Sequence, residues 1–314
     1  MSKRIAISCT LLASVAFLPA AFAASPIDRL LGNSEYFDPS PYSEQDLDEE
    51  KQFAPESEGD ADLGEQFILK RYSGRSPIRF KLQTGAFWSD NVASSSFAEA
   101  DDWYWSTRAT VSWRPKIGSN LFFDSYIKHD FYRYDAKGLD FDSTEIGLGV
   151  VKIFPEFGEL VTFARYEYEH IDAEAFFGGD TSNHYHRIHI GAHKNFLNKA
   201  KHTAYIAADA NFDLDTDPPS SERHEYAAHL GYSWHPTDKL TATAFYRFAW
   251  LDYQNVSRED EFQTTGVELS YTFSEAVELK TSLVYGNNES DSSFGANDYE
   301  TLQAGIIANL VIKW

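Results

Sequence analysis

The chain has one cysteine, few basic residues and no long apolar stretch beyond its N-terminus. A lone Cys9 excludes disulfides within the chain and cysteine-based zinc sites. Lys and Arg number 27 against 48 Asp and Glu, a formal net charge of −21, and such a chain is repelled by phosphate backbones. No later run reaches the roughly 18 apolar residues that a transmembrane helix needs. Neither a nucleic-acid partner nor a helical membrane protein is therefore expected.

Aromatic residues are abundant in a chain that is otherwise polar. Phe, Tyr and Trp make up 16% of the residues, while the mean hydropathy is −0.42. The fold must therefore accommodate many aromatic rings in a polar sequence.

Residues 1–23 are predicted to be a signal peptide. Lys3 and Arg4 precede a mostly apolar stretch, and Ala21-Phe22-Ala23 forms a small-x-small cleavage site. Acylation of Cys9 is the alternative, but that residue lies at the start of the apolar stretch rather than at its end. We expect cleavage after Ala23 and export of the mature chain.

Residues 24–76 are predicted to be an acidic, disordered periplasmic tether. Up to Lys70 the segment has thirteen Asp and Glu against three Lys and Arg, with four prolines and few large aliphatic residues. It cannot bury enough apolar surface to offset the entropy cost of ordering. The short apolar patches at 27–31 and 67–69 leave a partner-binding role open.

From residue 77 to residue 314, apolar and polar residues alternate with period two. At the C-terminus Ile306, Ala308, Leu310, Ile312 and Trp314 share one parity. The alternating segments exceed ten residues, which is long for a globular strand and suits a tilted crossing of a bilayer. Twelve such segments are predicted, at 78–88, 102–114, 120–132, 142–154, 159–171, 183–194, 202–212, 224–235, 239–251, 262–273, 276–286 and 299–313.

The connections between these segments alternate in length. Five short turns and six long polar loops join the twelve segments, and both ends of the repeat lie on the short-turn side. This pattern is typical of an antiparallel up-and-down transmembrane β-barrel. An aromatic residue also recurs every 38 to 42 residues before a short turn or the chain end, as a ring of aromatics at the lipid–water boundary requires: Trp113, Phe154, Phe196, Trp234, Phe273 and Trp314. We expect Trp88, Trp103, Trp105, Tyr253 and Tyr285 to form the opposite ring. A soluble sandwich or propeller is the alternative fold.

The parity opposite to the apolar stripe assigns charged residues to the barrel interior. Ten basic and nine acidic residues fall there and nearly cancel, and so many charges require a wet or mutually paired interior. The assigned pore-lining residues are Arg79, Arg108, Asp124, Lys128, Glu145, Arg165, Glu167, Arg187, Asp209, Glu225, Arg247 and Glu268, and the same parity adds Lys81, Arg114, Asp130, Glu169, Glu278, Lys280 and Lys313. The interior is expected to be either a narrow aqueous pore or a closed, ion-paired plug.

The six long loops carry a predicted net charge of −17. They would form a solvated rim that concentrates cations at the pore mouth. Asp213, Asp215 and Asp217 alternate in one loop and are weak candidates for a divalent cation, although the Gly and distal Glu of a helix–loop–helix calcium site are absent.

Histidines concentrate at His184, His186, His189 and His193 on one predicted strand. His189 and His193 share a face but lie roughly 13 Å apart at strand rise, so they cannot share a metal unaided. No serine lies in register with His184 and His186 to form a hydrolase site on the barrel exterior. We therefore predict neither an enzyme nor a cofactor.

Residues Gly305 to Trp314 resemble the C-terminal assembly signal of bacterial outer-membrane proteins. Alternate apolar positions, among them Leu310 and Ile312, lead to a terminal aromatic, here Trp314 where Phe is usual. Phe87 to Val92 is similar to a segment of porin-type barrels in Gram-negative bacteria, some of which accompany exopolysaccharide or surface-polymer systems. The resemblance implies insertion by the barrel-assembly machinery, contact with outer-membrane lipid and lipopolysaccharide, and a periplasmic tether and C-terminus.

These observations favour a porin-like channel for passive passage of small solutes or ions, with a weak preference for cations. The alternative is a closed barrel that acts as an anchor with surface-contact loops, or that has a role beside an exopolysaccharide or surface-polymer system.

Overall fold

The computed structural model of the chain describes residues 77–94, 99–135, 139–174, 180–292 and 297–314. The predicted signal peptide and acidic tether lie outside these residues. Within the described ranges, no helix is long and apolar enough to cross a membrane. The helices there are two short 3₁₀ turns, Pro155–Phe157 and Pro219–Ser221.

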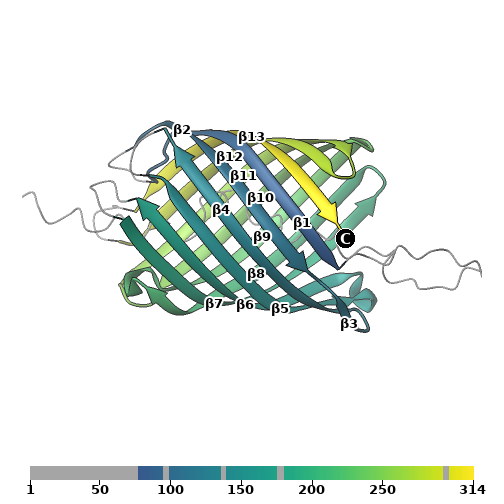
Figure 1. Cartoon of the computed structure of the whole chain (residues 1–314), viewed down its shortest axis with the longest axis horizontal. Helices are drawn as coiled ribbons and strands as arrows, with labels where there is room; N and C mark the ends of the chain where they lie inside the picture. The colour runs from purple at the N-terminus through teal and green to yellow at the C-terminus, as the bar shows by residue number, and fades with distance from the viewer. Residues whose placement is uncertain (1–76, 95–98, 136–138, 175–179, 293–296) are drawn as a thin grey trace, which may run out of the picture.

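Twelve long strands and one short strand form a closed antiparallel barrel (Figure 1). The short strand is β3 (Lys116–Gly118). The long strands are β1 (Ile78–Ser89), β2 (Asp102–Trp113), β4 (Leu121–Tyr134), β5 (Phe141–Phe154), β6 (Leu160–Glu174), β7 (Asp180–Lys199), β8 (His202–Asp217), β9 (Arg223–Thr237), β10 (Leu240–Tyr253), β11 (Arg258–Ser274), β12 (Val277–Ser290) and β13 (Tyr299–Lys313).

Each long strand pairs with its neighbours along the chain, and β1 closes the ring by pairing with β13. The closing register places Phe87 opposite Gly305 and Arg79 opposite Lys313. β2 pairs directly with β4, so β3 is an extension of that hairpin rather than a thirteenth strand of the barrel wall. The predicted twelve-stranded up-and-down barrel is confirmed.

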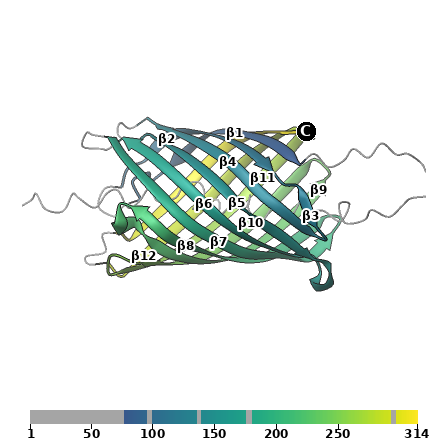
Figure 2. The same cartoon turned by 60° about the horizontal axis from the view of Figure 1, so that its bottom comes forward.

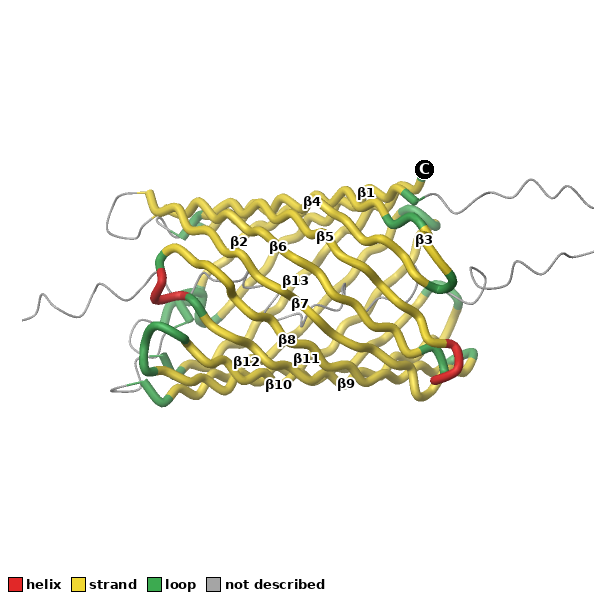
Figure 3. The backbone as a smooth tube through the Cα atoms, turned by 90° about the horizontal axis from the view of Figure 1, so that it is seen from below, coloured by secondary structure: helices red, strands yellow, loops and turns green. Residues whose placement is uncertain are grey.

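The barrel has two distinct ends (Figures 2 and 3). At the end that we call the turn end, short connections join the strands, and both Ile78 and Trp314 lie there, joined by a 3.1 Å hydrogen bond from the Trp314 N–H to the Ile78 carbonyl. At the opposite, loop end lie the longer connections. Of the connections between consecutive long strands, six lie at the loop end and five at the turn end.

The outer face is apolar and bordered by aromatic residues at both ends. Trp113, Phe196, Trp234, Phe273 and Trp314 are exposed at the turn end, and Trp103, Trp105, Trp250 and Tyr285 are exposed at the loop end. A strand of twelve residues, tilted by about 40°, rises by roughly 30 Å along the barrel axis, which is enough to span the apolar band of about 25 Å of a transmembrane barrel.

Two expectations about the strands were wrong in detail. Most strands extend further into the loops than predicted: β8 continues to Asp217 and β9 begins at Arg223, so the loop predicted at 213–223 shortens to residues 218–222. Strand pairing satisfies backbone groups there even though the side chains are polar, so hydropathy alone underestimates the strand. Tyr253, expected in the outer aromatic ring, is buried inside, because it shares the parity of Arg247 and Leu251.

Apolar clusters line parts of the interior near both ends. Towards the loop end, Phe87, Tyr104, Tyr132, Phe141 and Tyr185 belong to one buried cluster, and Leu251, Tyr253 and Phe262 belong to another. Nearer the turn end, Phe122, Val151, Ile153, Phe163 and Ala207 form a third. The charged residues of the interior lie between and beside these clusters.

Candidate functional site in the barrel interior

Strand alternation decides which side chains enter the interior. Along β4 the buried positions are Phe122, Asp124, Tyr126, Lys128, Asp130 and Tyr132, and the residues between them face outward. We call the side of the sheet to which these alternate, buried residues point the inner face. All twelve predicted pore-lining residues lie on it, and none of them is exposed at the surface of the barrel.

Asp124 is the most deeply buried carboxylate of the interior. Its side chain is 0% exposed and accepts hydrogen bonds of 2.6 Å from Nε of Arg114 and of 2.6 Å from Nε of Arg165. Asp124 lies on β4 and Arg165 on β6, while Arg114 directly follows β2, so the ion pairs connect separate parts of the barrel wall. Because both oxygens accept a charged donor, the cost of removing this carboxylate from water is offset by two ion pairs.

Carboxylates and histidines form a second network on β4, β6, β7, β8 and β9. Nδ1 of His189 lies 3.1 Å from Glu167, and its Nε2 lies 3.4 Å from Asp209. Asp209 in turn lies 2.7 Å from Nε2 of His229, and the Tyr126 hydroxyl lies 3.0 Å from Glu167. This band crosses five strands at mid-depth, and its members are nearly completely buried.

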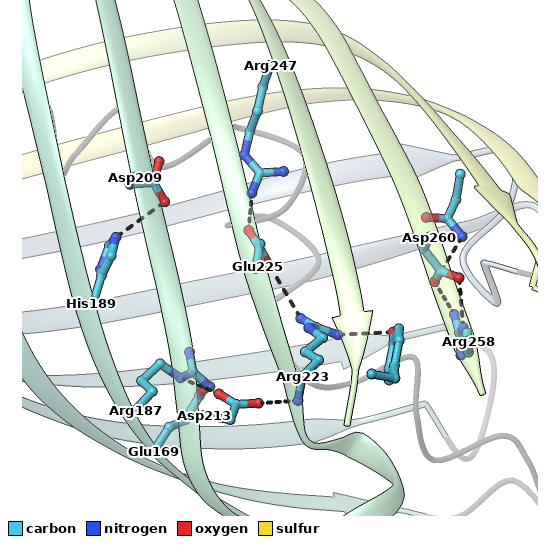
Figure 4. Close-up of polar contacts among 12 residues, drawn as sticks. Glu169, Arg187, His189, Asp209, Asp213, Arg223, Glu225, Arg247, Arg258 and Asp260 are labelled. Atoms are coloured by element: carbon cyan, nitrogen blue, oxygen red, sulfur yellow. Dashed lines mark hydrogen bonds and ion pairs between the residues drawn. The ribbon is translucent and has the colours of Figure 1, made fainter. Parts of the chain in front are cut away.

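A third network of alternating charge lies towards the loop end (Figure 4). Arg187 contacts Glu169 at 2.9 Å and Asp213 at 3.7 Å, and Asp213 accepts a 3.0 Å hydrogen bond from the backbone N–H of Arg223. The Arg223 guanidinium reaches Glu225, which also binds Arg247. Further ion pairs also lie on the inner face: Arg108 with Asp130, Lys128 with Glu145, Lys280 with Glu268 and Arg258 with Asp260.

Sequence reasoning missed several members of these networks. Asp213 and Arg223 were assigned to a loop because the strand ends were placed too early, although their parity on the extended strands is inward. His189 and His229 were not counted among the interior groups, although the same parity would have found them.

Five aromatic rings on the inner face lie against glycines of the neighbouring strand. In each case the ring and the glycine are direct cross-strand partners, and a Cβ added to the glycine would lie 2.1–2.5 Å from a ring carbon. The glycine gives the ring room to lie along the wall. The pairs are Tyr126 with Gly147, Phe163 with Gly191, Tyr205 with Gly231, Phe245 with Gly266, and Phe87 with Gly305.

The two sides of the interior differ in side-chain size. Between β4 and β8 the inner face carries large residues that are almost fully buried, such as Tyr126, Arg165 and Glu167. Between β9 and β12, in the half nearer the turn end, it carries small hydroxyl residues of intermediate exposure: Ser233, Thr241, Thr243, Ser270 and Thr272. This hydroxyl-lined wall is therefore built from smaller and more accessible side chains than the wall between β4 and β8.

Charge is unevenly distributed along the barrel axis. The inner-face positions within about six residues of the strand ends at the turn end are here named the turn half. The remaining inner-face positions are named the loop half. The turn half contains seven basic and three acidic residues, a net charge of +4: Arg79, Lys81, Arg108, Arg114, Arg165, Lys280 and Lys313 with Asp124, Glu268 and Glu278.

The loop half contains five basic and nine acidic residues, a net charge of −4: Lys128, Arg187, Arg223, Arg247 and Arg258 with Asp102, Asp130, Glu145, Glu167, Glu169, Asp209, Asp213, Glu225 and Asp260. The interior is therefore neutral in total and polarised along its axis.

Sequence comparisons leave the family open, and structural comparison defines the fold. No protein-family model matches the sequence, and no curated protein matches it significantly. The structure is similar to an outer-membrane channel from Pseudomonas putida F1, with 12% identity and a TM-score of 0.53 over 76% of this chain and 96% of that chain. The chain has the fold of a bacterial outer-membrane β-barrel.

More distant likenesses are to the outer-membrane channel DcaP of Acinetobacter baumannii and the translocator domain of the autotransporter NalP from Neisseria meningitidis. The first has 10% identity and a TM-score of 0.42, covering 75% of this chain and 96% of that chain. The second has 14% identity and a TM-score of 0.43, covering 76% and 89%.

The predicted metal candidates do not converge on one site. Asp213 is buried against Arg187 and Arg223, whereas Asp215 and Asp217 are exposed beyond a register shift in the β7–β8 pairing. His184 and His186 lie on the outer face, where Nδ1 of His186 is 2.5 Å from the Tyr166 hydroxyl. Across the described ranges, no three His, Cys, Asp or Glu residues are placed to hold a metal ion.

The residues of the predicted assembly signal belong to the closing strand of this outer-membrane barrel. Gly305 lies on the inner face beneath the Phe87 ring, while Ile312 and Trp314 are exposed on the outside at the turn end. Leu310 pairs with Leu82 of β1, so the segment that resembles the signal also forms the seam of the barrel.

Proposed function

We propose that this chain is a porin-like channel of the outer membrane, through which small solutes or ions pass passively. The observation that carries the proposal is the combination of an apolar outer face with a charged inner face and a hydroxyl-lined wall in one closed barrel. An interior with this many ionised groups is stable when it holds water or mutual ion pairs. The fold shared with the Pseudomonas putida channel supports the same class of function.

The proposed orientation places the turn end in the periplasm and the loop end outside the cell. Short periplasmic turns and longer external loops are usual in bacterial barrels. In this orientation the C-terminus and the segment before residue 77 are periplasmic. The signal peptide would export the chain from a Gram-negative cytoplasm, the barrel-assembly machinery would insert it, and lipid and lipopolysaccharide would surround its outer face.

The proposed selectivity is a weak preference for cations, set at the loop end. The exposed Asp215, Asp217, Glu259 and Glu261 and the half-buried Asp252 lie on strand ends at that mouth, and the loop half of the interior adds a net charge of −4. Such a field raises the local concentration of cations at the mouth. The same carboxylates would also retain divalent cations at the loops. The proposal includes no catalytic step and no cofactor.

Conductance of the refolded full chain in planar bilayers tests the proposal. We expect discrete conductance steps whose size increases with salt concentration. A refolded chain that is heat-modifiable on gels, inserts into bilayers and carries no current would contradict it.

A closed anchor barrel is the second candidate, and one observation favours it. The inner side chains between β4 and β8 are almost fully buried, including Asp124 at 0% exposure and Glu167 at 2%. A barrel of this kind would display its loops or tether for surface contact, for example beside a surface-polymer system. It predicts membrane insertion without conductance, so the same bilayer measurement separates the two candidates.

A further inference from the structure

Three basic residues gather on the inner face at the seam between β13 and β1. Arg79 and Lys313 are direct cross-strand partners, and Lys81 follows Arg79 on the same face of β1. Like charges directly opposite each other on a sheet repel. The seam is the most basic part of a turn half whose net charge is +4. Three basic side chains placed together in this way are suited to binding a polyanion.

The first strand of the barrel begins at this mouth, beside the basic seam. The Pro77 carbonyl accepts a 2.7 Å hydrogen bond from the backbone N–H of Arg114, and β1 begins at Ile78, one residue before Arg79. Whatever precedes residue 77 is therefore tethered within a few residues of the basic seam.

The sequence before residue 77 contains a dense run of carboxylates. Residues 44–65 contain ten Asp and Glu and one Lys, a net charge of −9 in 22 residues. They lie outside the described residues. The twelve residues between positions 65 and 77 span at most about 40 Å when extended, enough to reach the mouth.

We propose that the turn half of the lumen binds the acidic segment 44–65 of the same chain, through carboxylates that contact Arg79, Lys81 and Lys313. Charge-assisted hydrogen bonds from Arg and Lys to carboxylates are the strong ones in proteins. The covalent connection gives the segment an effective concentration on the order of millimolar, well above that of a free polyanion. This favours the chain's own segment over another anionic ligand.

Disulfide cross-linking in the full chain tests the proposal. One variant combines Cys9→Ser, Ser57→Cys in the acidic segment and Ser112→Cys on the inner face, opposite Arg79. The matched control replaces Ser112→Cys with Val111→Cys, because Val111 is adjacent but 49% exposed on the outer face. We expect oxidation to cross-link the first pair and not the control. Raising the salt from 0.1 M to 1 M, which shortens the screening length from about 10 Å to about 3 Å, should lower the yield about fivefold.

Charge variants separate binding from mere proximity. Arg79→Gln, Lys81→Gln and Lys313→Gln together should reduce the cross-link to a similar extent, whereas Arg79→Lys with Lys81→Arg and Lys313→Arg should retain it. Heat-modifiability on gels establishes that each variant is folded. Equal cross-linking of the inner and outer cysteines, a yield unaffected by salt and by the Gln variants, or no cross-link at the inner position would overturn the proposal. The readout needs no current, so it stands apart from a failure of the proposed channel function.

Discussion

The ring of Tyr205 lies directly over Gly231, its cross-strand partner on β9. A Cβ added to Gly231 would lie 2.1 Å from Cε1 and 2.4 Å from Cζ of that ring. Four other aromatic–glycine pairs repeat this arrangement on the inner face. The rings can lie along the wall because the glycines lack a side chain, so these glycines are required for space rather than for an unusual backbone conformation.

Gly231→Ala should therefore destabilise the barrel by about 1–3 kcal/mol, the usual cost of overpacking. The double variant with Tyr205→Ala should lose most of that cost, because the added methyl group then has room, and a double-mutant cycle measures the coupling. Urea unfolding in lipid vesicles, followed by tryptophan fluorescence, provides the free energies. Gly118→Ala is the control, because a Cβ there meets Leu121 at an ordinary 3.5 Å. Equal effects at both glycines would contradict the steric explanation.

Asp124 offers a second test, because it holds two arginines inside the barrel. Asp124→Asn should cost about 3–5 kcal/mol, since it leaves Arg114 and Arg165 without their shared carboxylate charge. Asp142→Asn is the matched control: its pair with Arg133 has the same 2.6 Å distance but both side chains are more than a third exposed. That change should cost about 0–1 kcal/mol. Similar unfolding free energies for the two variants would show that burial does not strengthen the Asp124 pairs.

The alternation of residues predicted the inward orientation of charges within the middle of each strand. Arg165 and Asp124 were assigned to the interior from parity alone, because each strand has one apolar and one polar face. Their contact was not predictable, because strand parity says nothing about how far side chains reach across the neighbouring strands. Asp213 was misplaced for a different reason: β8 was predicted to end at residue 212, whereas the strand continues to Asp217 and keeps its parity as far as Asp213.

The partners of His189 illustrate the same limit. Two carboxylates reach its ring, one from β6 and one from β8, and their alignment depends on the registers of two hairpins. Turn lengths constrain these registers only approximately, since β6 and β7 both extend past the predicted ends. Strand number and direction were predictable because they depend on the repeated pattern over many residues rather than on any one turn.

Trp314 is expected to be needed for membrane assembly. Its exposed side chain lies on the outside of the closing strand at the turn end, and its backbone N–H bonds to Ile78 of β1. Deleting Trp314, or the change Trp314→Asp, should block assembly while export continues, because the resemblance of the last strand to an assembly signal depends on this aromatic residue. Ile306→Leu, an apolar change on the same face, is the control. Normal outer-membrane levels and heat-modifiability of the Trp314 variants would refute the prediction.

The acidic loop end should set ion selectivity if the barrel conducts. Asp215 and Asp217 are exposed at this mouth, whereas Asp213 is buried with Arg187 and Arg223. Asp215→Asn combined with Asp217→Asn should weaken the cation preference at 0.1 M salt, where screening acts over about 10 Å, and change little at 1 M, where it acts over about 3 Å. Asp213→Asn should instead alter the conductance at both salt concentrations, because it disturbs the ion pairs of the interior.

Reversal potentials in a salt gradient measure this preference, and single-channel conductance measures the effect of Asp213. Lys199→Gln, at the exposed turn end of β7, is a control that changes the charge by one unit at the end of the barrel far from the loop mouth. The wild-type channel should prefer cations at low salt and lose most of the preference at 1 M. Anion selectivity, or a cation preference that persists at 1 M, would mean that the polarised interior rather than the rim determines which ions pass.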